Sequence, residues 1–354
     1  MTRLLAIGFE AGSLDEVPHT ELYNSQCVIS IVTASPRNGD RCLKLAQNGY
    51  YPSGWYTWSM AAAKTEIWTR FGFKPAVSGT GTAGNEEEFL AFYDAEGTET
   101  LRLQYDRRTG AIKAYRGSTV IATSSGALSI STAGSWHLIE VRYKPHNSTG
   151  IVEVYLNGTQ VINFASGDST NGLESVLTVG LANNNPNSGG DYTDHYFDDW
   201  VINDTAGAVN NGRPNDGAIL MLQPTGAGTT TQLTRGGADS GANWSQVDEI
   251  PPDDADYVYS ATVGQRDLYV LEDLPSGVGT IFSVSVLARA KEEISGVGQI
   301  GLTQKSGAVT TEDTAEALES TYRFYADLRE VNPETTAAYS VAGVNALEAG
   351  VTVR

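Results

Sequence analysis

The chain has 354 residues, enough for two ordinary domains, and its 40% apolar residues and 38 glycines suit a folded, loop-rich protein rather than a disordered one. Its 23 basic and 42 acidic residues give a net charge of −19. Such a charge repels phosphate backbones, so we expect no nucleic-acid partner.

The N-terminal run MTRLLAIGFEAGSLDE shows neither a secretion signal nor a membrane-spanning segment, so we expect no membrane insertion. The two cysteines that follow, Cys27 and Cys42, lack the spacing of a metal site and form no disulfide framework. Because nothing else indicates an oxidising compartment, free thiols are favoured over a bridge.

Residues 48–58, NGYYPSGWYTW, hold five aromatic residues among eleven. Lectins stack sugar rings on exposed aromatic side chains, so Tyr50, Tyr51, Trp55 and Trp58 are candidate glycan-binding residues. The alternative is that Trp55 and Trp58 belong to a core or an inter-subunit contact. That alternative is favoured, since large aromatic residues in β proteins are mostly buried.

Short alternating stretches follow, which predict strands over 88–95, 100–107, 111–117 and 119–124. Asn157-Gly158 is the strongest hairpin signal in the chain, and a two-residue loop there would pair Leu156 with Thr159 and Val154 with Val161. Strands at this spacing indicate an antiparallel sandwich.

Acidic clusters give little sign of catalysis. Glycosidases on sandwiches of this kind place acidic residues as E-x-D-x-x-E on one strand, and no such triplet occurs. Glu86, Glu87 and Glu88 are consecutive, so we expect them to diverge as a solvated cluster. Since the four histidines are also scattered, the sequence predicts a protein that is not an enzyme.

The stretch DYTDHYFDDW (191–200) is the densest group of potential ligands. Side chains alternate along a strand, so Asp198 and Asp199 are expected on opposite faces. Asp191, Asp194 and His195 are expected in the loop before that strand. The cluster is therefore interpreted as the end of a sandwich, without the convergence that a hydrolase needs.

Several segments in order resemble laminin-G-like domains of the concanavalin A-like jelly-roll class. They are IGFEAG (7–12), WHLIEVRY (136–143), VEVYLNG (152–158), LTVGL (177–181) and YFDDWVI (196–202). The resemblance covers about residues 1–205 and implies two curved antiparallel sheets whose first and last strands are adjacent. It also implies a cation site, because Glu10 and Asp199 or Asp198 match positions that share calcium in some relatives. The alternative is an edge aspartate bound to loop amides, and no cofactor is certain.

After residue 205 a Gly- and Asn-rich stretch, 206–217, is expected as a linker, followed by a second, smaller β-sandwich-like domain over 218–354. Strands are expected at 218–224, 256–262, 267–274 and 280–291, and a helical turn or two at 312–320. The segments WSQVDEIPPDD (244–254), ARA (288–290) and VNALEAGV (344–351) resemble C-terminal modules of tailed-bacteriophage virion proteins. The acidic loop 243–260 is a candidate inter-subunit contact.

This resemblance implies a bacteriophage virion structural protein, either a tail or baseplate component or a capsid decoration subunit. Its partners would be other virion proteins and copies of itself, and its location the virion, after synthesis in the host cytoplasm. An alternative is a carbohydrate-binding adhesin or receptor-binding protein that holds host-surface glycan with its first domain. A second alternative is a glycan depolymerase.

Overall fold

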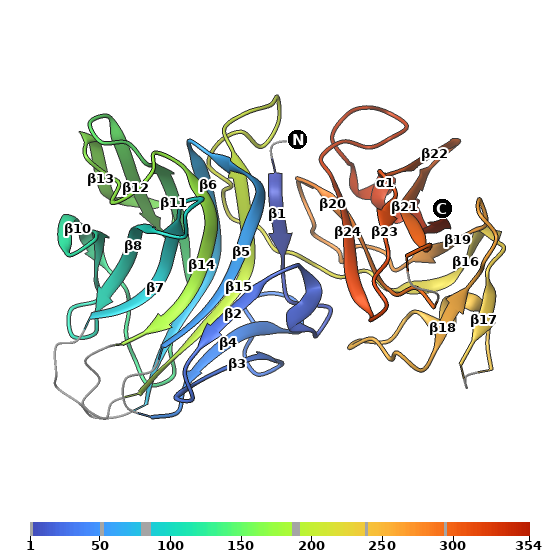
Figure 1. Cartoon of the computed structure of the whole chain (residues 1–354), viewed down its shortest axis with the longest axis horizontal. Helices are drawn as coiled ribbons and strands as arrows, with labels where there is room; N and C mark the ends of the chain where they lie inside the picture. The colour runs from blue at the N-terminus through green and yellow to red at the C-terminus, as the bar shows by residue number, and fades with distance from the viewer. Residues whose placement is uncertain (1–2, 50–52, 79–85, 186–191, 238–239, 294–295) are drawn as a thin grey trace. The chain divides into compact units, whose positions relative to one another are not determined.

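The computed structural model describes residues 3–49, 53–78, 86–185, 192–237, 240–293 and 296–354 (Figure 1). They form two compact units, here called the first domain (residues 3–10 and 18–219) and the second domain (residues 11–17 and 220–354). In this described part of the chain, no helix is long and apolar enough to cross a membrane.

The first domain consists of two antiparallel sheets. Sheet A runs in the order β13 (Thr159–Gly167), β12 (Gly150–Leu156), β11 (His137–Lys144), β6 (Ile67–Ser78), β15 (Tyr192–Asp204), β4 (Cys42–Gln47) and β3 (Cys27–Val32), and β1 (Arg3–Ile7) also pairs with β15. Sheet B runs in the order β10 (Thr119–Ala127), β9 (Ala111–Arg116), β8 (Glu99–Asp106), β7 (Glu86–Tyr93), β14 (Val176–Asn184), β5 (Ser53–Lys64) and β2 (Thr20–Tyr23).

The inner faces of sheets A and B are joined by a cluster of aromatic side chains. Phe73 of β6 stacks on Phe89 of β7 with ring centroids 4.9 Å apart, and Phe71 and Phe197 contact the same pair. All four are fully buried. Because apolar residues alternate along these strands, each strand offers one face to this core. The predicted all-β jelly-roll sandwich, with its first and last strands paired, is confirmed.

The hairpin at Asn157-Gly158 forms as expected, with one difference in register. Leu156 pairs with Thr159, but Val154 pairs with Ile162 rather than Val161. A bulge between Val154 and Tyr155 causes the shift, since one extra residue on β13 moves the pairing by one position. Cys27 and Cys42, at opposite ends of the β3–β4 pair, are buried free thiols.

Residues 205–219, which include the expected linker 206–217, pack against the first domain. Arg213 makes two hydrogen bonds to Glu140 of β11, at 3.0 and 2.6 Å. Asn203 donates to the Gly212 carbonyl at 3.2 Å, and the Ile219 amide donates to Asp199 at 2.7 Å. The first domain therefore extends to residue 219.

The second domain is a smaller β structure. Its main sheet runs β16 (Pro224–Thr231), β19 (Arg266–Leu271), β25 (Glu348–Val353), β21 (Gln299–Ser306) and β22 (Val309–Glu312), with β23 (Glu316–Ala317) also paired to β21. Two further pairs are β17 (Thr234–Gly236) with β18 (Tyr257–Tyr259), and β20 (Val284–Ala290) with β24 (Arg323–Arg329). The helical segments are η1 (Leu14–Glu16), η2 (Asn243–Gln246) and α1 (Val341–Asn345).

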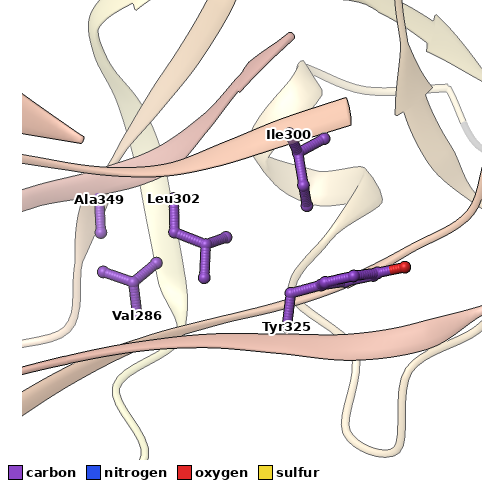
Figure 2. Close-up of a cluster of buried hydrophobic side chains, with 5 residues drawn as sticks. All are labelled: Val286, Ile300, Leu302, Tyr325 and Ala349. Atoms are coloured by element: carbon purple, nitrogen blue, oxygen red, sulfur yellow. The ribbon is translucent and has the colours of Figure 1, made fainter. Parts of the chain in front are cut away.

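A small apolar core holds this domain together (Figure 2). Val286 and Tyr325, from the β20–β24 pair, face Ile300, Leu302 and Ala349 from the main sheet, and all five are buried. Two β layers packed around this cluster confirm the predicted second, smaller β-sandwich-like domain.

Two local predictions in this region are wrong. Residues 218–223 form no strand, and β16 begins at Pro224. The backbone amide of Ile219 donates a hydrogen bond to the carboxylate of Asp199 instead of to a neighbouring strand. Residues 312–320 form no helix but contribute the two-residue strand β23. The helical turn occurs at α1, where the hydroxyl of Ser340 accepts a hydrogen bond from the Gly343 amide at 3.0 Å.

Candidate functional site

The aromatic segment around β5 is divided between the two faces of sheet B. Tyr56 points inward and contacts Phe9 and Trp200. By alternation along the strand, Trp55 lies on the outer face, whereas Trp58 shares the inner face with Tyr56. The other two predicted glycan-binding residues, Tyr50 and Tyr51, lie outside the described residues.

Glu10, one of the predicted metal ligands, is buried beside the loop that precedes β4. Its Oε2 accepts a hydrogen bond from the Asp40 amide at 2.9 Å, while its Oε1 is buried without a hydrogen-bond partner. Burial raises the pKa of Glu10 to about 7, although the amides of Asp40 and Arg41 oppose the shift.

Asp198 and Asp199 converge, so the prediction that they diverge is wrong. The pairing of β15 with β6 shifts between Asp198 and Val201, and Asp199 has a φ of 52°, which interrupts the strand alternation. Asp198 accepts hydrogen bonds from the amides of Arg37 and Asn38, at 2.8 and 3.2 Å. Asp199 accepts from the side chains of the same two residues, at 2.9 and 2.6 Å.

These contacts give the predicted metal ligands other partners. Asp199 is ion-paired with Arg37, and burial together with the charge of Asp199 raises the pKa of Asp198. Among the described residues, no three His, Cys, Asp or Glu side chains gather in a way that could hold a metal ion. Calcium binding through Glu10, Asp198 and Asp199 stays a prediction of the resemblance.

The acidic run at the start of β7 does not form a solvated cluster. Glu86 and Glu88 point to the outer face of sheet B, whereas Glu87 points into the sandwich. Glu87 is fully buried and Glu88 is 2% exposed. Neighbouring residues do diverge, as expected, but residues two apart share a face, so Glu86 and Glu88 both point to the outer side of sheet B.

Glu88 lies beside Trp55 on this outer face, where β5, β14 and β7 run side by side (Figure 1). Its carboxyl group accepts hydrogen bonds from the Trp55 indole at 2.7 Å and from the Asn184 amide at 3.1 Å. Burial and the charge of Glu99 raise the pKa of Glu88 to about 7, against the opposing effect of these two donors. A carboxyl group with such a pKa can hold a proton at neutral pH and release it.

Glu86 is held by cationic and hydroxyl groups from the neighbouring strands. Lys113 and Tyr115 of β9 both contact its carboxylate. With its amide turned to match its neighbours, Gln104 of β8 donates to Glu86 at 3.2 Å and accepts from Arg102 at 3.0 Å. The Arg102 guanidinium also lies over the Tyr115 ring, 4.7 Å from its centre. Polar and aromatic side chains on the outer face thus form one group around Glu88, from β5, β7 and β14, and another around Glu86, from β7, β8 and β9.

The inner glutamate is part of a separate, fully buried polar group. Tyr105 donates a hydrogen bond to Glu87 at 2.5 Å, and His195 contacts Tyr105 at 2.9 Å and Glu87 at 3.3 Å. Burial alone would raise the pKa of Glu87, but His195, Arg107 and Tyr105 lower it overall. Asp194 and His195 lie within β15, not in the loop expected before it, and Asp191 is outside the described residues.

The outer face of sheet B offers the chemistry that a saccharide requires. Trp55, Tyr93 and Tyr115 are partly exposed aromatic residues, and Asn184, Arg102 and Lys113 are polar groups among them. Glu86 and Glu88 could have been found in the sequence as two acids with a spacing of two on a predicted strand. Their partners come from strands far along the chain, and no local pattern identifies those.

Comparison with known proteins gives matches in structure alone. No protein-family model matches the chain, and no curated protein matches its sequence. Among solved structures, an endo-β-1,4-glucuronan lyase from the fungus Trichoderma reesei is 13% identical, with a TM-score of 0.44, over 56% of this chain and 94% of that one. A Bacillus subtilis protein of unknown function with a galectin-like fold is 12% identical, with a TM-score of 0.41, over 57% and 96%.

Other matches include an alginate lyase, 15% identical with a TM-score of 0.39 over 56% of this chain and 96% of that one. A carbohydrate esterase from a Shiga toxin-encoding bacteriophage is 17% identical, with a TM-score of 0.38, over 57% and 98%. The prediction that the chain is not an enzyme is therefore corrected, since polysaccharide lyases and an esterase are among the structures similar to it. That prediction also rested on the expectation that the glutamates at 86–88 diverge into solvent. This expectation is wrong, because Glu86 and Glu88 share a face. At these identities, the likeness concerns the fold.

Proposed function

We propose that the first domain binds a glycan on the outer face of sheet B and that Glu88 donates a proton to the bound saccharide. The observation that supports this most directly is the pair formed by Trp55 and Glu88. It places an aromatic surface next to a carboxyl group whose pKa is raised to about 7. An aromatic ring beside an acid that is protonated near neutral pH suits general-acid hydrolysis of a glycosidic bond, in which the acid protonates the leaving oxygen while water adds to the anomeric carbon and loses a proton to solvent.

The charges on this face favour a neutral glycan. Its acidic residues include Glu86, Glu88 and Glu99, and its basic residues Arg102 and Lys113 are already paired with Glu99 and Glu86. A polyuronate would bring one carboxylate per sugar to a surface whose described cations are engaged, in a chain with a net charge of −19. Hydroxyl groups could instead be bound by the amides of Asn184 and Gln104 without a charge conflict.

Variants of Trp55 and Glu88 test binding and cleavage separately. Neutral polysaccharides and polyuronates would be compared by affinity electrophoresis and by release of reducing ends. We expect Trp55→Ala to weaken retention by a neutral polysaccharide about tenfold, since a stacking contact is lost. Glu88→Gln should retain binding, because a side-chain oxygen still accepts from Trp55, but lose the release of reducing ends.

Trp58→Phe is the matched control, because it changes a tryptophan of the same strand on the inner face, and binding should be unchanged. The proposal fails if no neutral polysaccharide is retained or cleaved. It also fails in its catalytic part if Glu88→Gln releases reducing ends at the wild-type rate.

A setting in a bacteriophage virion is supported by the sequence resemblance of the second domain and by one structural feature. Tyr257 and Tyr259 of β18 are 39% and 51% exposed, and their rings lie 6.0 Å apart. Exposed tyrosines are frequent in protein–protein interfaces. We propose on these grounds that the second domain makes contacts with other virion proteins or with copies of itself, so that the glycan-binding domain would be displayed on a particle.

A further inference from the structure

A pocket of about 290 Å³ opens on the outer face of sheet A. The proposed glycan-binding face belongs to the other sheet of the sandwich, sheet B. The pocket lies entirely within the first domain. Its lining includes Trp136, Leu138, Glu140, Asn157, Arg213 and Asp216. Arg213 and Asp216 belong to the segment 205–219, so the pocket exists because this segment packs against the sheet.

Trp136 gives the pocket a fixed aromatic wall. Its indole nitrogen donates to the Ser35 carbonyl at 3.2 Å, and Lys74 lies 5.4 Å from the ring centre. The ring also packs beside Gly72 of β6, where a Cβ would lie 3.4 Å from it. The ring is therefore oriented before any ligand arrives, which reduces the entropy lost on binding.

The charged groups around the pocket neutralise one another. Glu140, which is fully buried, binds Arg213 through two hydrogen bonds, and the Arg213 guanidinium lies 3.9 Å from the centre of the Tyr155 ring. Asp216 is paired with Arg37, which also binds Asp199. An anion would meet Glu140 and Asp216, and a cation would meet Arg213 and Arg37, so an uncharged ligand is favoured.

We propose that this pocket binds one neutral sugar ring, stacked on Trp136 and hydrogen-bonded by the polar groups of the rim. The volume is near the lower limit of small-molecule sites, which suits one ring rather than a chain. Leu138 and the indole offer apolar surface to the C–H face of a ring, while Asn157 and the exposed carboxylate of Asp216 offer partners for hydroxyl groups. The site is separate from the outer face of sheet B and does not depend on the function proposed for it.

The test is binding of small saccharides to the full chain. Methyl β-glucoside, methyl β-galactoside and N-acetylglucosamine would be titrated by calorimetry and by saturation-transfer NMR at millimolar concentration. We expect at least one of them to bind the wild-type protein, and Trp136→Ala to weaken that binding about tenfold. Trp136→Phe, which keeps a ring beside Gly72 and guards against misfolding, should weaken it less.

Trp58→Phe is the control, because Trp58 lies on the inner face of sheet B, outside both proposed sites, and this variant should leave the binding unchanged. The proposal is overturned if none of the three probes binds, or if both Trp136 variants bind as tightly as the wild type. Binding that is lost in Trp55→Ala and kept in Trp136→Ala would assign the sugar to sheet B. That outcome would remove this proposal while supporting the function proposed above.

Discussion

At the scale of single residues, Glu88 combines burial with a polar environment. The side chain is almost completely buried, and its carboxyl group accepts hydrogen bonds from the neutral donors Trp55 and Asn184. Trp55 and Asn184 stabilise the charged form of Glu88, but the cost of burying that charge is larger. The pKa of Glu88 therefore rises to about 7. An acid in this state destabilises the fold at neutral pH, which suggests that it is kept for a function rather than for stability.

The stability of Glu88→Gln should depend on pH in a defined direction. The folded-state pKa lies above the ordinary value of 4.5, so the folded protein holds the proton more tightly than the unfolded chain. The free energy of unfolding of the wild type should therefore fall as pH rises from about 4.5 to about 7. The variant lacks this loss, so at pH 8 it should exceed the wild type by at most about 3 kcal/mol, and at pH 4 the two should be equal.

Urea denaturation at both pH values measures this difference. Glu86→Gln is the control, because Glu86 is partly exposed and ion-paired, so its replacement should cost less than about 1 kcal/mol at pH 8 rather than stabilise. A Glu88→Gln variant that is less stable than the wild type at pH 8 would contradict a raised pKa for Glu88.

At the scale of elements, the bulge in β15 determines where two acidic side chains point. A regular strand would send Asp198 and Asp199 to opposite faces, but the positive φ at Asp199 lets both reach the loop that contains Arg37 and Asn38. The Asp199 side chain is fully buried and that of Arg37 is 15% exposed. This ion pair therefore fixes both the bulge and the loop before β4.

Arg37→Met should destabilise the first domain by about 3 kcal/mol, because it leaves the carboxylate of Asp199 buried without its cation. The double variant Arg37→Met/Asp199→Asn should be more stable than Arg37→Met alone. Asparagine tolerates the positive φ and can still accept from the Ile219 amide, while the buried charge is removed. Chemical denaturation of the single and double variants gives the coupling energy, and additive effects would show that the pair contributes nothing.

The same element shows what the sequence can and cannot predict. Alternation identifies the sandwich, the hairpin at Asn157-Gly158 and the buried faces of most strands, since each depends on neighbouring residues. The bulge at Asp199 depends on Arg37, which lies 162 positions away, and no local pattern encodes such a contact. The site on the outer face of sheet B could be predicted only in part. The spacing of Glu86 and Glu88 is visible in the sequence, but their partners come from three other strands, namely Trp55, Lys113 and Asn184.

At the scale of the whole molecule, the two domains have different surfaces. The first domain presents polar networks on the outer faces of both sheets, around Glu88 and around Trp136. The second domain exposes the Tyr257–Tyr259 pair on the two-stranded sheet formed by β17 and β18. Ligand binding and assembly are therefore expected to depend on different residues of the same chain.

The double variant Tyr257→Ser/Tyr259→Ser tests this separation. If β18 mediates contacts between copies, the wild-type protein should sediment as an oligomer and the variant as a smaller species, because two partly exposed aromatic rings would be lost from the interface. Both substitutions are at exposed positions of β18, so the melting temperature should change little. Glycan retention should be unchanged in this variant, whereas Trp55→Ala should reduce retention and leave sedimentation unchanged. A wild-type protein that sediments as a monomer would exclude self-association through β18. A tyrosine variant that loses glycan retention would contradict the division of roles between the two domains.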